Sequence, residues 1–420
     1  MANRLFTAFI LAVSFFAFTQ ISQAMTVRVA VMKKVKAVTI SSEWPVNVVN
    51  GRDGSPVAVA EARTMKVKYT KGGFSVNGKN ISSGDLRFST SGIIKAGGAS
   101  YHGMIQVVKN HAGGAAVVNH VDMEDYVAGV ISREMGPEWP LEALKAQAIA
   151  SRTYAIMRMD RAADRIYDLD NTVASQVYHG TRGVGSNVKE AVFSTSGMIA
   201  MYEGEPAYTF YHSSAGGMTE DLKYVWGRES RPYLTAQTAP YEDASRVNSW
   251  RVKLGAKEIQ SRLAKAGFRI KQVNDVEVLS YTSSGRVKMV RVTGAKGQKQ
   301  DITAGNFRCA VGETKVRSTK FTIAAGKKGS FIFEGEGFGH AVGMSQWSAR
   351  GMAEHGATSS EIIEHFYPGV YLSSLDDGLK FAEARTTTLD IDSAIVEQAQ
   401  QEEAPANDTT APVSENSEVK

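Results

Sequence analysis

Alternating hydrophobic and polar positions over residues 27–118 predict a β-rich N-terminal region. Val27, Val29 and Val31 fall on one face of a strand, and Gly, Asn and Ser residues break the pattern at 51–54, 71–78 and 97–98. This part of the chain therefore reads as short strands joined by turns.

The apolar period changes to that of a helix after Asp122, a residue suited to cap a helix N-terminus. This helix ends at Gly136-Pro137, and Pro140 opens a second helix over 141–159, in the first-turn position where its missing N–H does no harm. The apolar positions that define the first helix are Tyr126, Val130, Ile131 and Met135.

The remaining chain mixes strands and helices. Strand patterning returns over 191–217, and Thr358-Ser359-Ser360-Glu361 is a capping box for a last helix that stops at Pro368-Gly369. Between them the pattern predicts a helix near 256–266, strands at 277–279, 287–292 and 330–333, a Gly-rich loop, and a helix at 345–355. The predicted fold class is α+β.

The first residues have the pattern of a secretory signal peptide. A polar start with one cation precedes an apolar run over 5–18, and Ser22-Gln23-Ala24 is a small-x-small cleavage site. We expect export to the periplasm, cell envelope or exterior. The run is shorter than the roughly 20 residues that a membrane-spanning helix needs, and no Cys follows the cut, so we expect no membrane anchor.

The chain has 420 residues, enough for two or three domains, and its charge is unevenly spread. Its net charge is +5, but the 386–420 tail has eight acidic residues against Lys420, so the rest carries +12. An exported basic protein is more suited to cell-envelope glycan than to nucleic acid. A single Cys, Cys309, excludes an intramolecular disulfide.

These patterns divide the chain into six segments. They are a signal peptide (1–24), a β-rich region (25–118), the first part of a core with the helix pair (119–250), a helix-plus-strands subdomain (251–328), a Gly-rich loop with C-terminal helices (329–385), and a disordered acidic tail (386–420).

Two cations lie on the apolar face of the second helix. Lys145 and Arg152 are seven residues apart, and therefore on one side of the helix. Buried cations must meet carboxylates or line a cleft, and long side chains can also extend to a nearby surface. Glu134 and Glu138, just upstream, could pair with them, so the pattern leaves these alternatives open.

The loop 335–343 contains four glycines and His340. Such a loop allows close backbone approach to a ligand, and the helix start at Ser345 favours an anionic group. Its spacing is not that of a dinucleotide-binding fingerprint. His340 is a candidate site residue, with a structural hydrogen bond as the alternative.

Several ordered motifs resemble the SpoIID/LytB family of bacterial cell-wall proteins. They span about 250 residues and are Arg133-Glu134-Met135, Trp139-Pro140-Leu141-Glu142-Ala143-Leu144-Lys145-Ala146-Gln147-Ala148, Ser151-Arg152-Thr153-Tyr154, Ser175-Gln176-Val177-Tyr178, Tyr211-His212-Ser213-Ser214-Ala215-Gly216-Gly217, Pro232-Tyr233-Leu234 with Trp250, and Gly337-Phe338-Gly339-His340-Ala341-Val342-Gly343-Met344-Ser345-Gln346-Trp347. Phe338, Ala341 and Trp347 depart from the family's usual Trp, Gly and Tyr.

The resemblance implies a lytic transglycosylase of peptidoglycan, acting on glycan strands whose stem peptides have been removed, with Glu134 as the catalytic acid. Peptidoglycan is then the expected partner, with a cell-wall amidase as a second partner, because another family branch contains amidase enhancers. The matching motifs imply these substrate-binding residues: Lys145, Gln147, Arg152, Gln176, Tyr178, His212, Ser213, Ser214, Gly216, Gly217, His340 and Gln346.

Two alternatives remain open at this point. A non-catalytic amidase regulator or peptidoglycan-binding protein needs no acid, and a hydrolytic muramidase needs a second carboxylate, for which Glu220 or Glu336 is available by type. Some family members bind zinc through a Cys/His cluster just before the Gln-x-Tyr motif. Residues 170–175 contain neither Cys nor His here, so we expect no metal and no cofactor.

Overall fold

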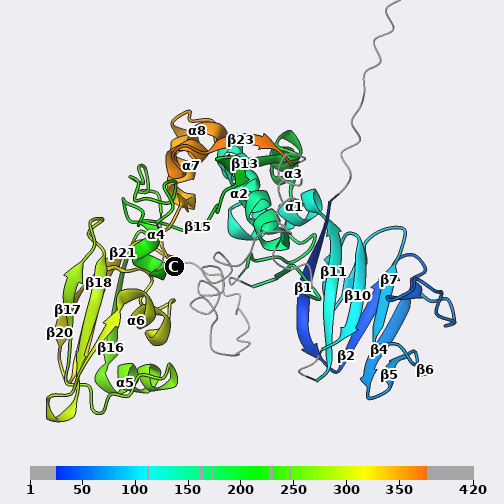
Figure 1. The fold of residues 1–420 in the computed structure, drawn as a ribbon, viewed down its shortest axis with the longest axis horizontal. Helices are drawn as coiled ribbons and strands as arrows, with labels where there is room; N and C mark the ends of the chain where they lie inside the picture. The colour runs from blue at the N-terminus through cyan, green and yellow to red at the C-terminus, as the bar shows by residue number, and fades with distance from the viewer. Residues whose placement is uncertain are drawn as a thin grey trace, which may run out of the picture.

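The computed structural model describes residues 25–110, 113–160, 165–172, 175–227, 230–245 and 247–375 (Figure 1). The predicted signal peptide and acidic tail lie outside the described residues. In Figure 1 a β-sandwich, a central group of helices and a second mixed α/β region follow one another across the molecule, and the fold is α+β as expected. No helix in the described ranges has the length and apolarity to cross a membrane.

The N-terminal region consists of two six-stranded sheets. Val27 and Val29 on the first strand are fully buried, so the predicted alternation is confirmed there. The first sheet has the order β12 (Leu169–Asp170), β1 (Thr26–Val35), β11 (Ala115–Asp122), β10 (Met104–Lys109), β7 (Asp85–Ser89), β3 (Asn47–Asn50). The second has the order β6 (Lys79–Ile81), β5 (Gly73–Val76), β4 (Thr64–Thr70), β2 (Ala37–Ser42), β8 (Ile94–Ala96), β9 (Ala99–Tyr101).

The central helices follow β11 without a linker. Asp122 accepts the Glu124 N–H at 2.9 Å and caps the first helix, and the capping box of Thr358 and Glu361 is also present, as predicted. The helices are α1 (Met123–Glu134), α2 (Leu141–Asp160), α3 (Ser186–Ser194), α4 (Leu222–Trp226), α7 (Gln346–Glu354) and α8 (Ser359–Phe366). Their buried residues form one continuous apolar core with those of the β-sandwich.

Short strands connect distant parts of this central region. In particular β15 (Tyr211–His212) pairs in parallel with β22 (Met344–Ser345), which brings the two Gly-rich motifs together. A separate small sheet has the order β14 (Glu205–Pro206), β13 (Met198–Tyr202), β23 (Tyr371–Ser374). The start of the 191–217 stretch is thus helical in α3, not extended as the sequence analysis expected.

The third region has an apolar core of its own. Its elements are β16 (Ser249–Gly255), α5 (Ala256–Lys265), β17 (Asp275–Tyr281), β18 (Val287–Thr293), the 3-10 helix η1 (Ala295–Gly297), β19 (Lys299–Thr303), α6 (Ala304–Val311), β20 (Lys320–Gly326) and β21 (Ser330–Glu336). The buried Arg286, in the turn between β17 and β18, donates to the carbonyls of Ala215 and Met218 and so holds this region against the first Gly-rich motif.

Candidate active site

Glu134 is the last residue of α1, and its side chain is half-buried. Its Oε1 accepts a hydrogen bond of 3.0 Å from the Val177 N–H. Burial raises the pKa of Glu134, because the charged form loses solvation; hydrogen bonds from Val177 and the Gln346 side chain, and the charge of Arg133, oppose this rise only in part. Among the described residues no Lys, Arg or His forms an ion pair with Glu134.

Three buried glutamines from distant segments lie near this carboxylate, and Gln346 contacts it directly. Gln346, at the start of α7, contacts Glu134 and donates to the Gln147 Oε1 at 3.4 Å. Gln147 in turn donates to the Ser151 Oγ at 3.0 Å. The side chains of all three, Gln147, Gln176 and Gln346, are buried, so their amides are fixed in place.

Gln176 links two tyrosines beside Glu134. It accepts from the Tyr126 hydroxyl at 2.8 Å and donates to the Tyr211 hydroxyl at 3.0 Å. Burial and the nearby Glu134 charge raise the pKa of Tyr211 well above its usual value, so this phenol stays protonated. Of the three predicted glutamines, Gln346 contacts Glu134, whereas Gln147 and Gln176 are buried and bonded to other protein groups; the contact of all three with substrate stays a prediction. Tyr211 was not among the predicted contacts.

The structure contradicts the predicted contact between Arg152 and substrate. Its side chain is fully buried and donates to both carboxylate oxygens of Glu124, at 3.0 and 2.5 Å, and to the Met198 carbonyl at 2.9 Å. Its partner is thus neither Glu134 nor Glu138, and it lines no open cleft. The expectation that Arg152 contacts substrate is wrong for this structure, because every side it presents is enclosed by protein.

Lys145 also has a protein partner. It forms an ion pair with Glu142 at 2.8 Å, and Glu142 accepts the Ser359 N–H at 2.7 Å, at the N-terminus of α8. The pair therefore joins α2 to α8. The side chain of Lys145 remains about one-fifth exposed, so its predicted contact with substrate stays a prediction.

The structure also contradicts the predicted contact between Tyr178 and substrate. Its side chain is buried, and its hydroxyl donates to the Asn119 Oδ1 at 2.8 Å. Its ring packs 5.2 Å from that of Tyr126 and over Gly129, where a Cβ would lie 2.5 Å from the Tyr178 ring. Tyr178 thus anchors α1 to the β-sandwich and is not accessible to a polymer.

The two Gly-rich motifs are held together by Glu242, which the sequence analysis did not identify. This buried carboxylate accepts from the Ala215 N–H and the Gly217 N–H, each at 2.7 Å, and from the Ser345 hydroxyl at 2.5 Å. Ser214 and Phe338 also exchange backbone hydrogen bonds of 3.0 and 2.8 Å. No local pattern marks Glu242, since its partners lie up to 103 residues away.

Glycine is required where these motifs meet. Gly216 has a left-handed φ of 69°, and a Cβ there would lie 2.9 Å from the Glu336 Cβ. The neighbouring Gly217 is exposed, and Ser213 accepts the Trp347 N–H through its carbonyl. The predicted site residues Ser213, Ser214, Gly216 and Gly217 therefore belong to one ordered loop pair, and their contact with substrate stays a prediction.

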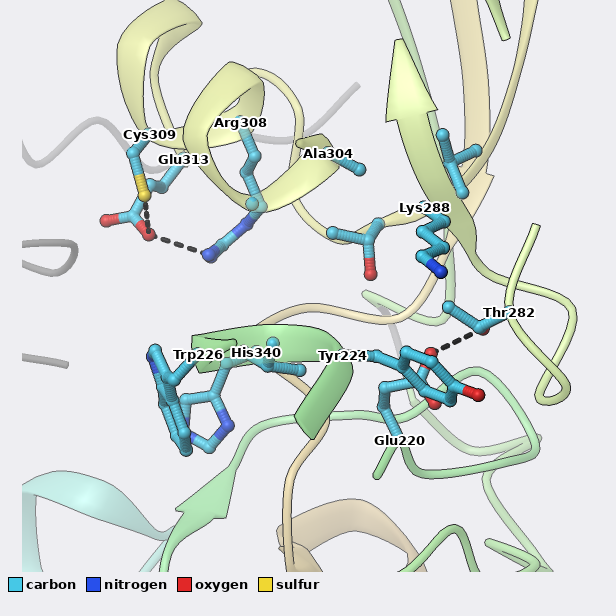
Figure 2. A pocket seen from close by; sticks show the side chains of 14 residues that line it. Glu220, Tyr224, Trp226, Thr282, Lys288, Ala304, Arg308, Cys309, Glu313 and His340 are labelled. Carbon is cyan, nitrogen blue, oxygen red and sulfur yellow. Dashed lines mark hydrogen bonds and ion pairs between the residues drawn. The ribbon is translucent and has the colours of Figure 1, made fainter. Parts of the chain in front are cut away.

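His212 and His340 lie together, with ring centroids 5.4 Å apart. Burial and the neighbouring His340 lower the pKa of His212, and burial with the Arg308 charge lowers that of His340 to about 3, so both rings are neutral. Figure 2 shows His340 beside Trp226 in a cavity whose other walls are Glu220 from the central region and Lys288 and Arg308 from the third region. His340 therefore faces the junction of these regions.

The alternative carboxylates have other partners. Glu220 is buried and accepts from the hydroxyls of Thr282 and Ser284, at 2.5 and 2.8 Å. Glu336 forms an ion pair with Lys320 at 2.6 Å. Glu220 contacts the third region and Glu336 is part of it, and neither forms a described contact with Glu134.

The segment 170–175, where some family members have zinc ligands, carries an ion pair here. Asp170 lies 2.5 Å from the Lys33 Nζ and accepts from the Thr172 hydroxyl, while Val173 and Ala174 lie outside the described residues. Within the ranges that the structure describes, no three His, Cys, Asp or Glu side chains gather as a possible metal site.

Comparison with known proteins agrees with these motifs. Residues 111–202, which contain α1, α2 and Glu134, match the SpoIID model, described as stage II sporulation protein, and 240–343 match a domain of unknown function. An uncharacterized protein of Brachyspira hyodysenteriae is 32% identical over 79% of this chain and 88% of its own length.

Two further relatives carry descriptive names. Stage II sporulation protein D of Bacillus amyloliquefaciens is 31% identical over 62% of this chain and 77% of its own length. The amidase enhancer of Bacillus subtilis is 30% identical over 59% of this chain and 40% of its own length. With its helix pair, its Gly-rich motifs and these matches, the chain belongs to the SpoIID family.

Proposed function

We propose that this protein is an exported peptidoglycan lytic transglycosylase with Glu134 as its acid and base. The names of its relatives, stage II sporulation protein D and amidase enhancer, support a role related to the bacterial cell wall. The finer assignment rests on one observation: a single half-buried carboxylate with a raised pKa, held by neutral amides and forming no ion pair in the described structure.

The reaction needs only one acid. Glu134 in its protonated form donates to the glycosidic oxygen between N-acetylmuramic acid and N-acetylglucosamine as that bond breaks. The resulting carboxylate then takes the proton from the 6-hydroxyl of the same N-acetylmuramic acid, whose oxygen attacks the anomeric carbon. The product is a 1,6-anhydro end, no water is consumed, and Glu134 recovers its proton.

The surroundings of Glu134 suit this cycle. A general acid that works near neutral pH needs a pKa above that of a free carboxyl, which burial supplies. The Val177 N–H and Gln346 side chain orient the carboxylate without a full positive charge, which would lower its pKa much further. The placement of Arg152 on Glu124 keeps that cation from Glu134.

Two other functions give different products. A hydrolytic muramidase ordinarily uses a second carboxylate, and neither Glu220 nor Glu336 contacts Glu134. A non-catalytic amidase enhancer would cleave nothing; the relative with that name is matched over only 40% of its length. The transglycosylase therefore remains the function that the site supports best, and a preference for peptide-stripped strands is part of the proposal.

Product analysis on purified glycan strands tests the proposal. Digestion of intact and amidase-stripped sacculi should release anhydro-ended fragments, faster from stripped material, and Glu134→Gln should release none. Glu138→Gln is the matched control, because Glu138 is exposed and lies four residues further on. Reducing ends would indicate a hydrolase, and no products from the parent protein would indicate a regulator.

A further inference from the structure

A cluster of two tryptophans and one arginine lies near Glu134. The indoles of Trp139 and Trp347 have centroids 4.9 Å apart at 56°, and the Arg350 guanidinium carbon lies 5.4 and 5.2 Å from the two rings. Arg350 also pairs with Glu354 at 2.8 Å, which fixes its position on α7. All three side chains, those of Trp139, Trp347 and Arg350, are half-buried, so the cluster reaches the surface.

The cluster is tied to the acid from both sides. Trp347 follows Gln346, whose side chain contacts Glu134. Trp139 folds back over Gly136, two residues after Glu134, so closely that a Cβ at position 136 would lie 2.6 Å from the indole Nε1. The two indoles therefore stand at the rim of the site that contains Glu134.

The polar groups of the cluster are open to a ligand. Within the described residues neither indole N–H of Trp139 or Trp347 donates a hydrogen bond to protein, and neither is a buried, unsatisfied group. Both N–H groups therefore lie at the surface, where a ligand can accept hydrogen bonds from them in place of water. Aromatic faces flanked by a few donors are typical of sites that bind small polar molecules.

We propose that Trp139, Trp347 and Arg350 form a saccharide subsite that holds one N-acetylated hexosamine of the glycan strand beside Glu134. The C–H face of a pyranose ring packs on the indoles, and the indole N–H and guanidinium groups donate to hydroxyl and acetamido oxygens. This inference rests on the proposed function for the identity of the strand. The arrangement of the three side chains does not depend on that proposal.

Binding measurements test the subsite separately from catalysis. The full chain carrying Glu134→Gln is titrated with soluble, peptide-free glycan strands. Trp139→Ala and Trp347→Ala should each weaken binding by about tenfold, and Trp347→Phe by less than about threefold, because Phe retains an aromatic face. Trp44→Ala is the control, since Trp44 is 57% exposed on the β-sandwich and should leave binding unchanged.

A further variant tests the position of Trp139 without removing its side chain. Gly136→Ala places a methyl group against the Trp139 indole without a forbidden backbone angle, and should weaken binding as Trp139→Ala does. Thermal unfolding of each variant shows whether it is folded. Unchanged binding in folded Trp139→Ala, Trp347→Ala and Gly136→Ala, or no binding by the Glu134→Gln parent chain, would overturn the subsite.

Cleavage assays then separate the two proposals. In the chain with Glu134 intact, Trp347→Ala should raise KM by about tenfold and leave kcat within about threefold. If strands bind through the tryptophans but the parent protein cuts nothing, the proposed activity fails and the subsite stands. If the parent cuts and the tryptophan variants retain its KM, the subsite alone fails.

Discussion

The buried Arg152 on α2 and the partly exposed Glu124 on α1 form a two-point ion pair, with nitrogen–oxygen distances of 3.0 and 2.5 Å. Glu124 also accepts the Gly197 N–H at 3.0 Å, and Arg152 donates to the Met198 carbonyl. One pair of side chains thus joins both helices to the start of β13. The cation that the helix pattern left unexplained is part of the framework that carries Glu134.

Arg152→Ala should therefore destabilise the protein strongly. Removal of the buried cation breaks its three hydrogen bonds and leaves a cavity, while the partly exposed Glu124 can regain water, so we expect a loss of about 2–4 kcal/mol. Denaturant unfolding measures the change, and the folded fraction should still bind glycan. Lys145→Ala is the control from the same helix; its partly exposed pair with Glu142 contributes about 1 kcal/mol or less. Similarly small losses of unfolding free energy in Arg152→Ala and Lys145→Ala would contradict the structural role of Arg152.

The raised pKa of Glu134 predicts how activity depends on pH. The acid must be protonated to start the reaction, so the rate should fall as the pH rises through the pKa of Glu134. The pH profile of kcat/KM on glycan strands measures this fall. A limb at the pKa of an ordinary exposed carboxyl would show that burial does not raise the pKa.

The same shift predicts the stability of Glu134→Gln. The folded protein holds the Glu134 proton more tightly than the unfolded chain, so the parent loses stability as the pH rises from the unfolded pKa through the higher folded pKa. Gln imitates the protonated form. As the pH rises through this range, the free energy of unfolding of the variant should therefore increase relative to that of the parent, by about 1.4 kcal/mol per unit of difference between the folded and unfolded pKa values of Glu134. Urea unfolding from pH 4 to pH 8 measures this, and a gap that does not change with pH would refute it.

Glu242→Ala should loosen the Gly-rich loop pair. It removes the common acceptor of two backbone N–H groups and the Ser345 hydroxyl, and buried donors without partners cost about 1–3 kcal/mol each. Unfolding free energy and cleavage rate should both fall. Asp243→Asn, at the exposed neighbouring position, should change neither; an equal effect of the two variants would contradict the role given to Glu242.

Chelators should leave glycan cleavage unchanged. Asp170, the one acid in the 170–175 segment, is paired with Lys33 and bonded to Thr172. Cleavage with and without EDTA, together with metal analysis of the purified protein, checks this prediction. Stoichiometric zinc would overturn it.

Local features of the sequence predicted local structure well. The Asp122 cap, the capping box at Thr358 and the helix after Pro140 are all present, since each depends on contacts within a few residues. The same logic could have found α3, whose Val188, Ala191 and Val192 have helical spacing and are buried. The motif around Glu134 marked this residue as the candidate acid, but its raised pKa depends on burial by other segments.

The sequence by itself determined the helix pair, because apolar period and capping act over one or two turns. Its Gly-rich motifs and its resemblance to the SpoIID/LytB family marked the position of the candidate acid. Only the tertiary structure decided that Arg152 pairs with Glu124, that Tyr178 is enclosed, and that Glu242 joins the two Gly-rich motifs. These partners are 25 to 103 residues apart, and packing of the whole core selects among the many acids and cations that composition allows.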